Sequence, residues 1–200
     1  MVTSKELRGG RYQAQPSGYR AFMPAPLPPR PPVRVEGDLQ SLLSKADHAL
    51  GRLDGSVLTL PNPDLFVFMY VRKEAVLSSQ IEGTQSSLQD LLAAEADLLG
   101  GERPRDVGEV INYVAAMRHG LSRLADLPVS VRLIKEIHAE LMKGARGGKL
   151  TPGELRRSQN WIGPAGSTLA SAAFVPPPHQ DIPDLLGNLE AFLHHEDELP

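Results

Sequence analysis

Two polar residues in the stretch SSQIEGT have a spacing at which side chains on a helix can act together. Ser78 and Glu82 are four residues apart, so on a helix they share one face and the hydroxyl can hydrogen-bond the carboxylate. Gly83 follows, and a glycine that ends the helix would leave Glu82 at the negative end of the helix dipole, at a cost of up to about 1 kcal/mol. An arginine from elsewhere would reverse that cost through a bidentate ion pair. A solvated glutamate beside a C-capping glycine is the alternative, and these residues alone leave both interpretations open.

Other catalytic patterns are absent from the sequence. It has no GxxxxGK[ST] phosphate loop, no GxGxxG after a strand and no HExxH. It has no cysteine, which excludes disulfides, thiolate metal ligands and a cysteine nucleophile. The adjacent pair His194-His195 would point in different directions on a helix, and His138 lies among apolar residues at helical spacing. We therefore expect no metal site and interpret His138 as a core or edge histidine.

The composition is that of a globular protein with a slight acidic excess. The formal net charge is −3, which argues against a general nucleic-acid or membrane-surface binder but leaves a local basic patch open. The N-terminus has no apolar signal-peptide region, and no stretch approaches the roughly 18 apolar residues that span a bilayer. We expect a cytoplasmic protein without a membrane or nucleic-acid partner.

Apolar residues recur at steps of three and four over most of the chain, which predicts a mainly α fold. The run LFVFMYV is apolar on nearly every side, as in a helix central to a core. Helices are expected from Asp38 to Leu53, from Pro63 after the N-cap residue Asn62, over about 86–99, after Asp106, from Ser130, and over about 183–195.

Two segments break the helical pattern. Residues 1–37 end in AFMPAPLPPRPPVRV, whose prolines favour an extended arm, which is either a flexible tail or a strap anchored by Phe22, Met23 and Leu27. The runs QNWIG and AAFVPPP are short and β-prone, and they predict a β-hairpin with a longer loop. We divide the chain into this arm, a helical domain over 38–102, and a second part over 103–200.

Several long stretches, taken in order, resemble Fic-family proteins. They are RYQAQPSGYRAFMPAPLPP, YVRKEAVLSSQIEGTQSSLQDLL, PGELRRSQNWIG and AAFVPPP. The likeness is to bacterial members with an inhibitory helix N-terminal to the catalytic core. The inhibitory motif of that family is [ST]xxxE[GN], which Ser78, Glu82 and Gly83 match. The resemblance implies a multi-helix bundle of the Fic type with one β-hairpin flap.

The resemblance also implies a chemistry. Fic proteins transfer AMP from ATP, with magnesium, to a hydroxyl side chain of a target protein. Glu82 would pair with an arginine of the catalytic loop and block the productive placement of the ATP γ-phosphate, with Ser78 steadying it. The flap would hold a target segment by strand pairing. Its arms would be Gln159, Asn160, Trp161, Ile162 and Gly163, and Ala173, Phe174 and Val175.

The catalytic signature of the family, HxFx[DE]GNGRxxR, does not occur in this sequence. We therefore assign no catalytic residue and expect ATP and magnesium to bind the complete family enzyme rather than this chain tightly. One hypothesis is the N-terminal part of an autoinhibited protein adenylyltransferase. A second is a non-enzymatic module that inhibits a separate Fic core in trans, and a third is a helical scaffold without a nucleotide role. The partners these hypotheses admit are a target protein and a second copy of the chain.

Overall fold

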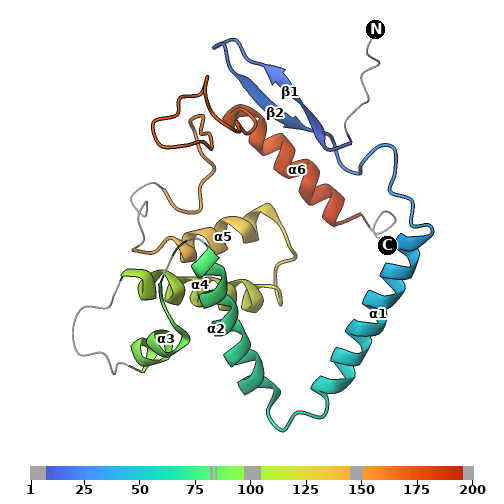
Figure 1. Ribbon diagram of the computed structural model, residues 1–200, viewed down its shortest axis with the longest axis vertical. Helices are drawn as coiled ribbons and strands as arrows, with labels where there is room; N and C mark the ends of the chain where they lie inside the picture. The colour runs from blue at the N-terminus through green and yellow to red at the C-terminus, as the bar shows by residue number, and fades with distance from the viewer. Residues whose placement is uncertain (1–7, 82, 84, 97–104, 145–150, 196–200) are drawn as a thin grey trace. The chain divides into compact units, whose positions relative to one another are not determined.

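The computed structural model describes residues 8–81, 83, 85–96, 105–144 and 151–195, and this part of the chain is mainly helical (Figure 1). A helix is present at each of the predicted positions, which confirms the mainly α class; residues 97–99 of the helix expected over about 86–99 lie outside the described residues. The helices are α1 (Asp38–Val57), α2 (Pro63–Ile81), α3 (Leu88–Glu95), α4 (Arg105–Arg123), α5 (Val131–Leu141) and α6 (Ile182–Leu193), with a 3-10 turn, η1, at His179–Asp181.

The chain divides into two compact units. Unit 1 consists of Met1–Arg34, Val129–Arg132 and Glu154–Pro200, and unit 2 consists of Val35–Pro128 and Leu133–Gly153. The N-terminal arm and the predicted flap therefore belong to one unit, although they are far apart in sequence. The sequence-based division at residues 37 and 102 stays a prediction.

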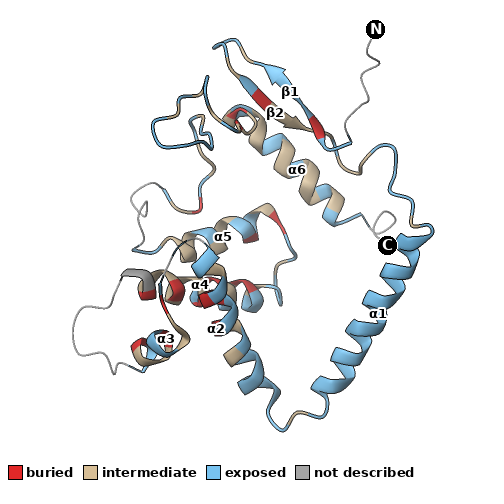
Figure 2. Cartoon of the chain, in the orientation of Figure 1, coloured by how far each residue is buried: buried red, intermediate tan, exposed pale blue. Residues whose placement is uncertain are grey.

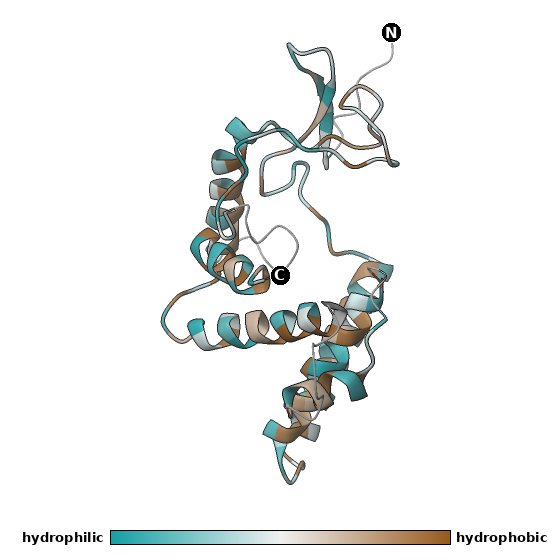
Figure 3. Cartoon of the chain, turned by 90° about the vertical axis from the view of Figure 1, so that its left-hand side faces the viewer, coloured by the Kyte–Doolittle hydropathy of each residue, from teal (hydrophilic) through white to brown (hydrophobic). Residues whose placement is uncertain are grey.

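The core of unit 2 lies where α2, α3 and α4 pack on one another. Hydrophobic and hydrophilic residues alternate around the helices (Figure 3), and five of the buried hydrophobic residues meet in one cluster. Its members are almost completely removed from solvent: Ala75, Val76, Leu91, Val110 and Val114. This cluster holds the second half of α2, the part that carries Ser78.

The start of α2 follows its sequence signals. The side-chain oxygen of Asn62 accepts a hydrogen bond from the Leu65 backbone N–H at 3.0 Å, and Pro63 is the first helical residue. Asn62 thus satisfies one of the N–H groups that lack a partner at a helix start, and proline at this position loses no helical hydrogen bond. The predicted N-cap is confirmed.

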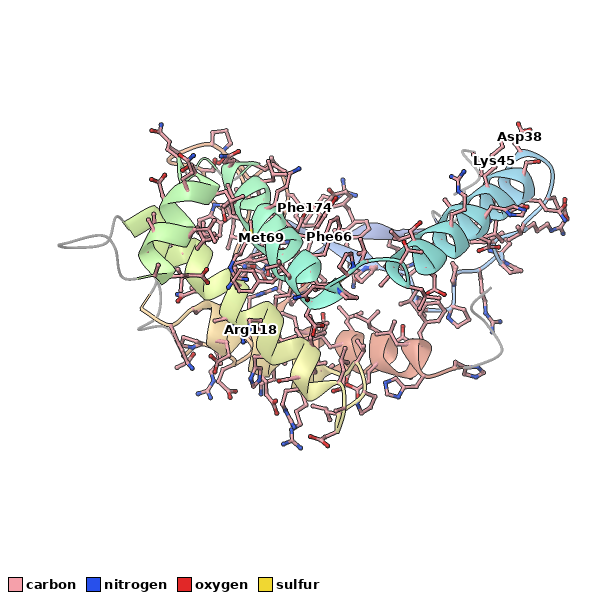
Figure 4. The ribbon with its side chains drawn as sticks, turned by 90° about the horizontal axis from the view of Figure 1, so that it is seen from below. Asp38, Lys45, Phe66, Met69, Arg118 and Phe174 are labelled. Carbon is pink, nitrogen blue, oxygen red and sulfur yellow. The ribbon has the colours of Figure 1, made fainter. Side chains whose placement is uncertain are left out.

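The first half of α2 is not buried, which corrects the expectation of a helix central to a core. Phe66 is 48% exposed and Tyr70 is 59% exposed, and the two rings contact each other with centroids 4.9 Å apart. Phe66 and Met69 are labelled on this stretch in Figure 4. None of the residues of the run, 65–71, is fully buried, and the buried residues of α2 follow it: Arg72, Ala75 and Val76.

Helix α1 has no buried residue, and it is coloured as exposed along its whole length in Figure 2. Figure 4 shows Asp38 and Lys45 on its first half. Its leucines are exposed as well, with Leu50 at 63% and Leu53 at 62%. The periodicity of these leucines predicted the helix correctly, although among the described residues nothing covers its apolar face.

Unit 1 contains a β-hairpin that the sequence interpretation missed. Strands β1 (Gly10–Ala14) and β2 (Arg20–Pro24) are antiparallel, with Tyr12 opposite Phe22. The extended-arm expectation is therefore wrong over 10–24. The prolines that suggested it begin at Pro24, and the strands before that residue carry only two strongly β-prone side chains, Tyr12 and Phe22, so the sequence contains little sign of them.

The rest of the arm is a strap rather than a free tail. The Leu27 N–H donates to Asn188 Oδ1 at 2.7 Å, and Asn188 Nδ2 donates to the Leu27 carbonyl at 3.0 Å. Asn188 is on α6, so this pair of hydrogen bonds fixes the arm along that helix. Of the two interpretations of the arm, the anchored one is confirmed. No helix in the described part of the chain is long and apolar enough to cross a membrane.

Candidate functional site

The last turns of α2 carry the serine of the predicted inhibitory motif. Ser78 is half-buried, and its hydroxyl donates to Glu74 Oε1 at 2.7 Å, one turn towards the start of the helix. Glu82 lies outside the described residues. Ser78 therefore has a carboxylate partner four residues before it, and a hydrogen bond from Ser78 to Glu82 stays a prediction.

Gly83 completes the motif in a conformation that favours glycine. Its φ angle is +91°, and its N–H donates to the Gln80 carbonyl at 3.0 Å. A Cβ at this position would meet nothing within 4 Å, so the backbone angle alone favours glycine there. Helix α2 ends at Ile81, which confirms the predicted helix end at this glycine.

The corner between α2 and α3 is held by side-chain hydrogen bonds. Gln80 Nε2 donates to the Ser86 carbonyl at 3.1 Å. Ser87 then caps α3, because its hydroxyl oxygen accepts from the Asp90 N–H at 3.1 Å while Asp90 Oδ2 accepts from the Ser87 N–H at 2.9 Å. The Ser87 hydroxyl and backbone N–H, which stabilise the carboxylate, lower the pKa of Asp90. The loop after α2 thus leads directly into α3, whose start is fixed by this capping box.

A buried ion pair joins the middle of α2 to the end of α3. Arg72 is 3% exposed, and its guanidinium donates to Glu95 through Nε at 2.6 Å and Nη2 at 2.9 Å. Arg72 Nη1 also donates to the Phe68 carbonyl at 3.0 Å, and the guanidinium carbon lies 3.2 Å from the centre of the Phe68 ring. Sequence reasoning missed this pair. The sequence did hold a sign of it: Arg72 is four residues from both Phe68 and Val76, which places an arginine on the apolar face of the helix.

The end of α2 is nevertheless exposed. Ile81, directly before the acid of the motif, is 85% exposed, and Gly83 is exposed as well. An anchored helix therefore presents an apolar side chain and a glycine turn to its surroundings.

The two predicted arms of the flap meet at one β-bridge. The Ile162 N–H donates to the Phe174 carbonyl at 2.8 Å, and the Phe174 N–H donates to the Ile162 carbonyl at 3.0 Å. The two predicted arms therefore pair at one bridge only, and the remaining arm residues, such as Gly163 and Ala173, lie outside any strand. Trp161 is 41% exposed and Ile162 is 67% exposed, with Trp161 Nε1 donating to the Ser167 carbonyl at 3.1 Å.

The base of the flap is fixed by residues that sequence reasoning did not select. Arg156 donates to the Ser158 carbonyl at 2.7 Å and to the Pro177 carbonyl, so one guanidinium ties the entry of the flap to its exit. Partial burial lowers the pKa of Arg156. Gln159 adds a second link, since its Nε2 donates to the carbonyls of Asn160 at 3.0 Å and Pro176 at 3.1 Å.

The N-terminal hairpin packs on the same base. The Phe22 N–H donates to the carbonyl of the buried Val175 at 2.8 Å, and the rings of Phe22 and Phe174 lie with centroids 6.0 Å apart. Tyr19 Oη donates to Gln159 Oε1 at 3.4 Å. Strand β2 is therefore the neighbour of the second arm, and the hairpin and the flap form one structure.

Comparison with known families places the α2 motif in context. Residues 40–122 match the family described as Fic/DOC family N-terminal. This part of the chain is similar to a Fic/DOC N-terminal region. The match covers most of α1, all of α2 and α3, and most of α4, so Ser78, Glu82 and Gly83 all lie inside it. The flap residues lie outside the matched range.

The Fic/DOC context raises the question of a Mg·ATP site, and the described residues do not fit one. Among them, no group of three or more His, Asp or Glu side chains is arranged to hold a metal ion. The sequence has no GxxxxGK[ST] loop to bind phosphates. His194, one of the pair rejected as a metal site, instead makes a 2.8 Å hydrogen bond through Nε2 with the Val129 carbonyl.

Proposed function

We propose that the chain is the autoinhibitory and target-docking region of a cytoplasmic protein adenylyltransferase of the Fic family. The observation that supports this most directly is the position of Ser78–Gly83. The motif lies within the Fic/DOC N-terminal match and follows the part of α2 that is anchored by the buried residues Arg72, Ala75 and Val76. In this proposal Glu82 pairs with an arginine of a Fic core and restrains AMP transfer to protein hydroxyl groups.

The anchoring of α2 explains how such a restraint would act. Ala75 and Val76 are buried and Arg72 is tied to Glu95, so the final turns of the helix have little freedom to move away. The acid of the motif follows these turns, where the helix dipole disfavours a negative charge. Pairing with a cation removes that penalty, so the helix end gains stability from an incoming arginine.

The geometry of the flap supports docking of an extended target segment. In an antiparallel pair, the backbone groups of residues next to a hydrogen-bonded pair point to the outer edges. Ile162 and Phe174 are such a pair, so the backbone groups of Trp161 and Gly163 point away from the second arm. The outer edge of the second arm is already contacted by β2 at Val175. A target strand therefore adds at the edge of Trp161 and Gly163.

ATP and magnesium belong to the Fic core in this proposal. A core with the sequence HxFx[DE]GNGRxxR would bind both, and this chain contributes the restraint and the docking surface. The core is either part of the same polypeptide or a separate protein.

Glu82→Gly in a protein that joins this chain to its Fic core tests the restraint. Incorporation of labelled AMP into the protein itself and into targets should rise. Glu82→Gln should give a smaller rise, since it keeps the side-chain shape without the charge. Glu74→Gln is the matched control, because Glu74 is the acid that Ser78 contacts, and it should leave incorporation near the unmodified level. Unchanged or lower incorporation with both Glu82 variants would refute the restraint.

The separate-module alternative has its own test. The purified chain is added to a Fic core that lacks an inhibitory helix, and AMP transfer is followed as the chain concentration rises. Inhibition by the unmodified chain, together with no inhibition by the Glu82→Gly chain, supports action in trans. Equal activity with and without the unmodified chain removes this alternative.

A further inference from the structure

Helix α1 carries apolar residues at the spacing of a coiled coil. They recur at alternating steps of four and three residues, which keeps them in one seam between two helices that wind around each other. We call these residues the α1 seam, and all six are exposed. They are Leu39, Leu43, Ala46, Leu50, Leu53 and Val57. The spacing therefore indicates a second helix as the partner of α1.

The helix needs such a partner, because little else stabilises it. Gly51 and Gly55 lie inside α1, and glycine inside a helix weakens it relative to most other residues. The N-cap residue, Gly37, makes no side-chain hydrogen bond, and no residue of the helix is buried. In proteins most of the stability of a helix comes from the packing of its apolar face. Among the described residues nothing supplies that packing for the α1 seam.

Charged residues of α1 repeat with the same seven-residue period. The stretches SKADHAL and GRLDGSV, residues 44–57, each place one basic and one acidic residue at matching positions. Lys45 and Arg52 lie to one side of the seam, and Asp47 and Asp54 lie to the other. Within the described ranges none of these four side chains forms an ion pair. Over two heptads the seam therefore has a basic flank and an acidic flank.

The two flanks are complementary between parallel copies of the helix. In a parallel pair the basic flank of each helix faces the acidic flank of the other, whereas in an antiparallel pair like flanks meet. These charges act across the seam over distances up to the Debye length, about 8 Å at physiological salt. Charge therefore favours a parallel pair, in which each seam residue also meets the same residue of the second copy.

We propose that the α1 seam joins two copies of this chain as a parallel two-stranded coiled coil. The helix has 20 residues, so it is about 30 Å long and holds nearly three heptads. The contact is symmetric, since the same surface of each copy takes part. The inference goes beyond the proposed restraint, because it involves neither Glu82 nor the flap.

Sedimentation equilibrium of the full chain tests the association. A dimer should form within a concentration range of about 1–100 μM. Leu50→Asp places a charge in the seam and should raise the Kd of the dimer at least about hundredfold, because leucines of both copies are lost from the contact. Leu58→Asp is the matched control, since Leu58 is 85% exposed, directly follows α1 and lies outside the seam. It should leave the Kd unchanged.

Single cysteines determine the orientation without placing a charge in the seam. The chain has no cysteine of its own, so each introduced thiol is unique. Leu39→Cys and Leu53→Cys should both give disulfide-linked dimers under mild oxidation, because a parallel pair brings each within the roughly 4.4–6.8 Å between Cα atoms that a disulfide allows. An antiparallel pair brings only one height of the helix opposite itself, so it cannot link both. His48→Cys, on the opposite face of α1, is the control and should link much more slowly.

Exchange of charges tests the flanks. Lys45→Asp/Arg52→Asp makes both flanks acidic and should raise the Kd about fivefold or more at low salt. Adding Asp47→Lys and Asp54→Lys to that variant exchanges the two flanks and should restore the original Kd. High salt should reduce the differences among these variants, since exposed charges are screened.

Several results would overturn the inference. They are a monomer over the whole concentration range, equal effects of Leu50→Asp and Leu58→Asp, linking of either seam cysteine no faster than His48→Cys, and no rescue by exchanged flanks. Dissociation of the dimer by an added Fic core would assign the seam to that core instead. None of these measurements involves AMP transfer, so the proposed restraint is tested separately.

Discussion

Arg72 and Glu95 form a bidentate ion pair that fastens α2 to α3, with N–O distances of 2.6 and 2.9 Å. The pair brackets the loop between the two helices, and the end of the proposed inhibitory motif, Gly83, lies in that loop. Arg72 is buried, whereas the Glu95 side chain is 25% exposed, so the carboxylate end is partly solvated. The position of the motif therefore depends on a polar contact as well as on the apolar cluster around Val76.

Glu95→Gln should destabilise the protein, because it leaves the Arg72 guanidinium buried without a counter-charge. We expect the free energy of unfolding to fall by about 2 kcal/mol, below the roughly 3–5 kcal/mol of a fully buried pair, since water reaches Glu95. Urea denaturation followed by circular dichroism measures the change. In a protein joined to its Fic core, the same variant should raise AMP transfer, because the motif is less firmly held.

Glu140→Gln is the matched control for Glu95→Gln. Glu140 pairs with Lys143 on the surface at 2.6 Å, and this hydrogen-bonded lysine lowers the pKa of Glu140. An exposed pair contributes little to stability, so the urea midpoint should hardly move. Equal effects of the two variants would show that burial of Arg72 does not decide the strength of its pair.

The helices were predictable because their signals are local. Asn62 before Pro63 predicts the start of α2, and Gly83 predicts its end, because glycine adopts a positive φ angle that other residues rarely adopt. Burial was less predictable. The run LFVFMYV is apolar on nearly every side, yet the fully buried residues of α2 all follow it, because the sequence of a helix does not say which neighbouring elements pack on it.

The candidate site was also predictable only in part, because the sequence of a segment does not say which distant segments pack on it. The β-bridge between Ile162 and Phe174 follows from two β-prone runs, but its support comes from Phe22, far away in the sequence. Strands β1 and β2 were not predicted, because the prolines that follow them favoured an extended arm. Contacts between distant segments, such as Arg72 with Glu95, depend on tertiary packing and leave at most a weak local signal.

Asp90→Asn should change how the stability of the folded protein depends on pH. The pKa of Asp90 is lowered in the folded protein by hydrogen bonds from Ser87, so the carboxylate adds stability above its unfolded pKa of about 3.9. That contribution is lost as pH falls through the lower, folded pKa. Urea midpoints measured between neutral pH and about pH 3 should therefore fall less steeply in the variant than in the unmodified protein.

Ser87→Ala provides an independent measurement of the same cap. It removes the hydroxyl that accepts from the Asp90 N–H, and we expect a loss of about 1 kcal/mol at neutral pH. The acid dependence should flatten as it does in Asp90→Asn. An unchanged acid dependence in both variants would mean that the Ser87–Asp90 hydrogen bonds do not persist in solution.

Gly83→Ala should destabilise the end of α2 through backbone strain alone. The φ angle of +91° disfavours a Cβ, while the space around it is open, so the cost should be about 1 kcal/mol. Gly51→Ala is the contrast, because Gly51 is inside α1 with open space and no positive φ. It should stabilise the protein by about 0.5–1 kcal/mol. The same sign in thermal unfolding for both variants would contradict the assignment at Gly83.

Phe22→Ala should loosen the flap from the N-terminal hairpin. Phe22 is half-buried between the rings of Tyr12, at 5.5 Å, and Phe174, at 6.0 Å, so its loss should cost about 2 kcal/mol. Trp161 is the single tryptophan of the chain, and its emission reports on the flap directly. Phe66→Ala is the matched control: Phe66 is 48% exposed and stacks on Tyr70, so its loss should cost less than about 1 kcal/mol and leave the Trp161 emission unchanged. If Phe22→Ala leaves both the stability and the emission as they were, then the Phe22 ring does not support the flap, and its base is held by the backbone hydrogen bond from residue 22 to Val175 together with Arg156 and Gln159.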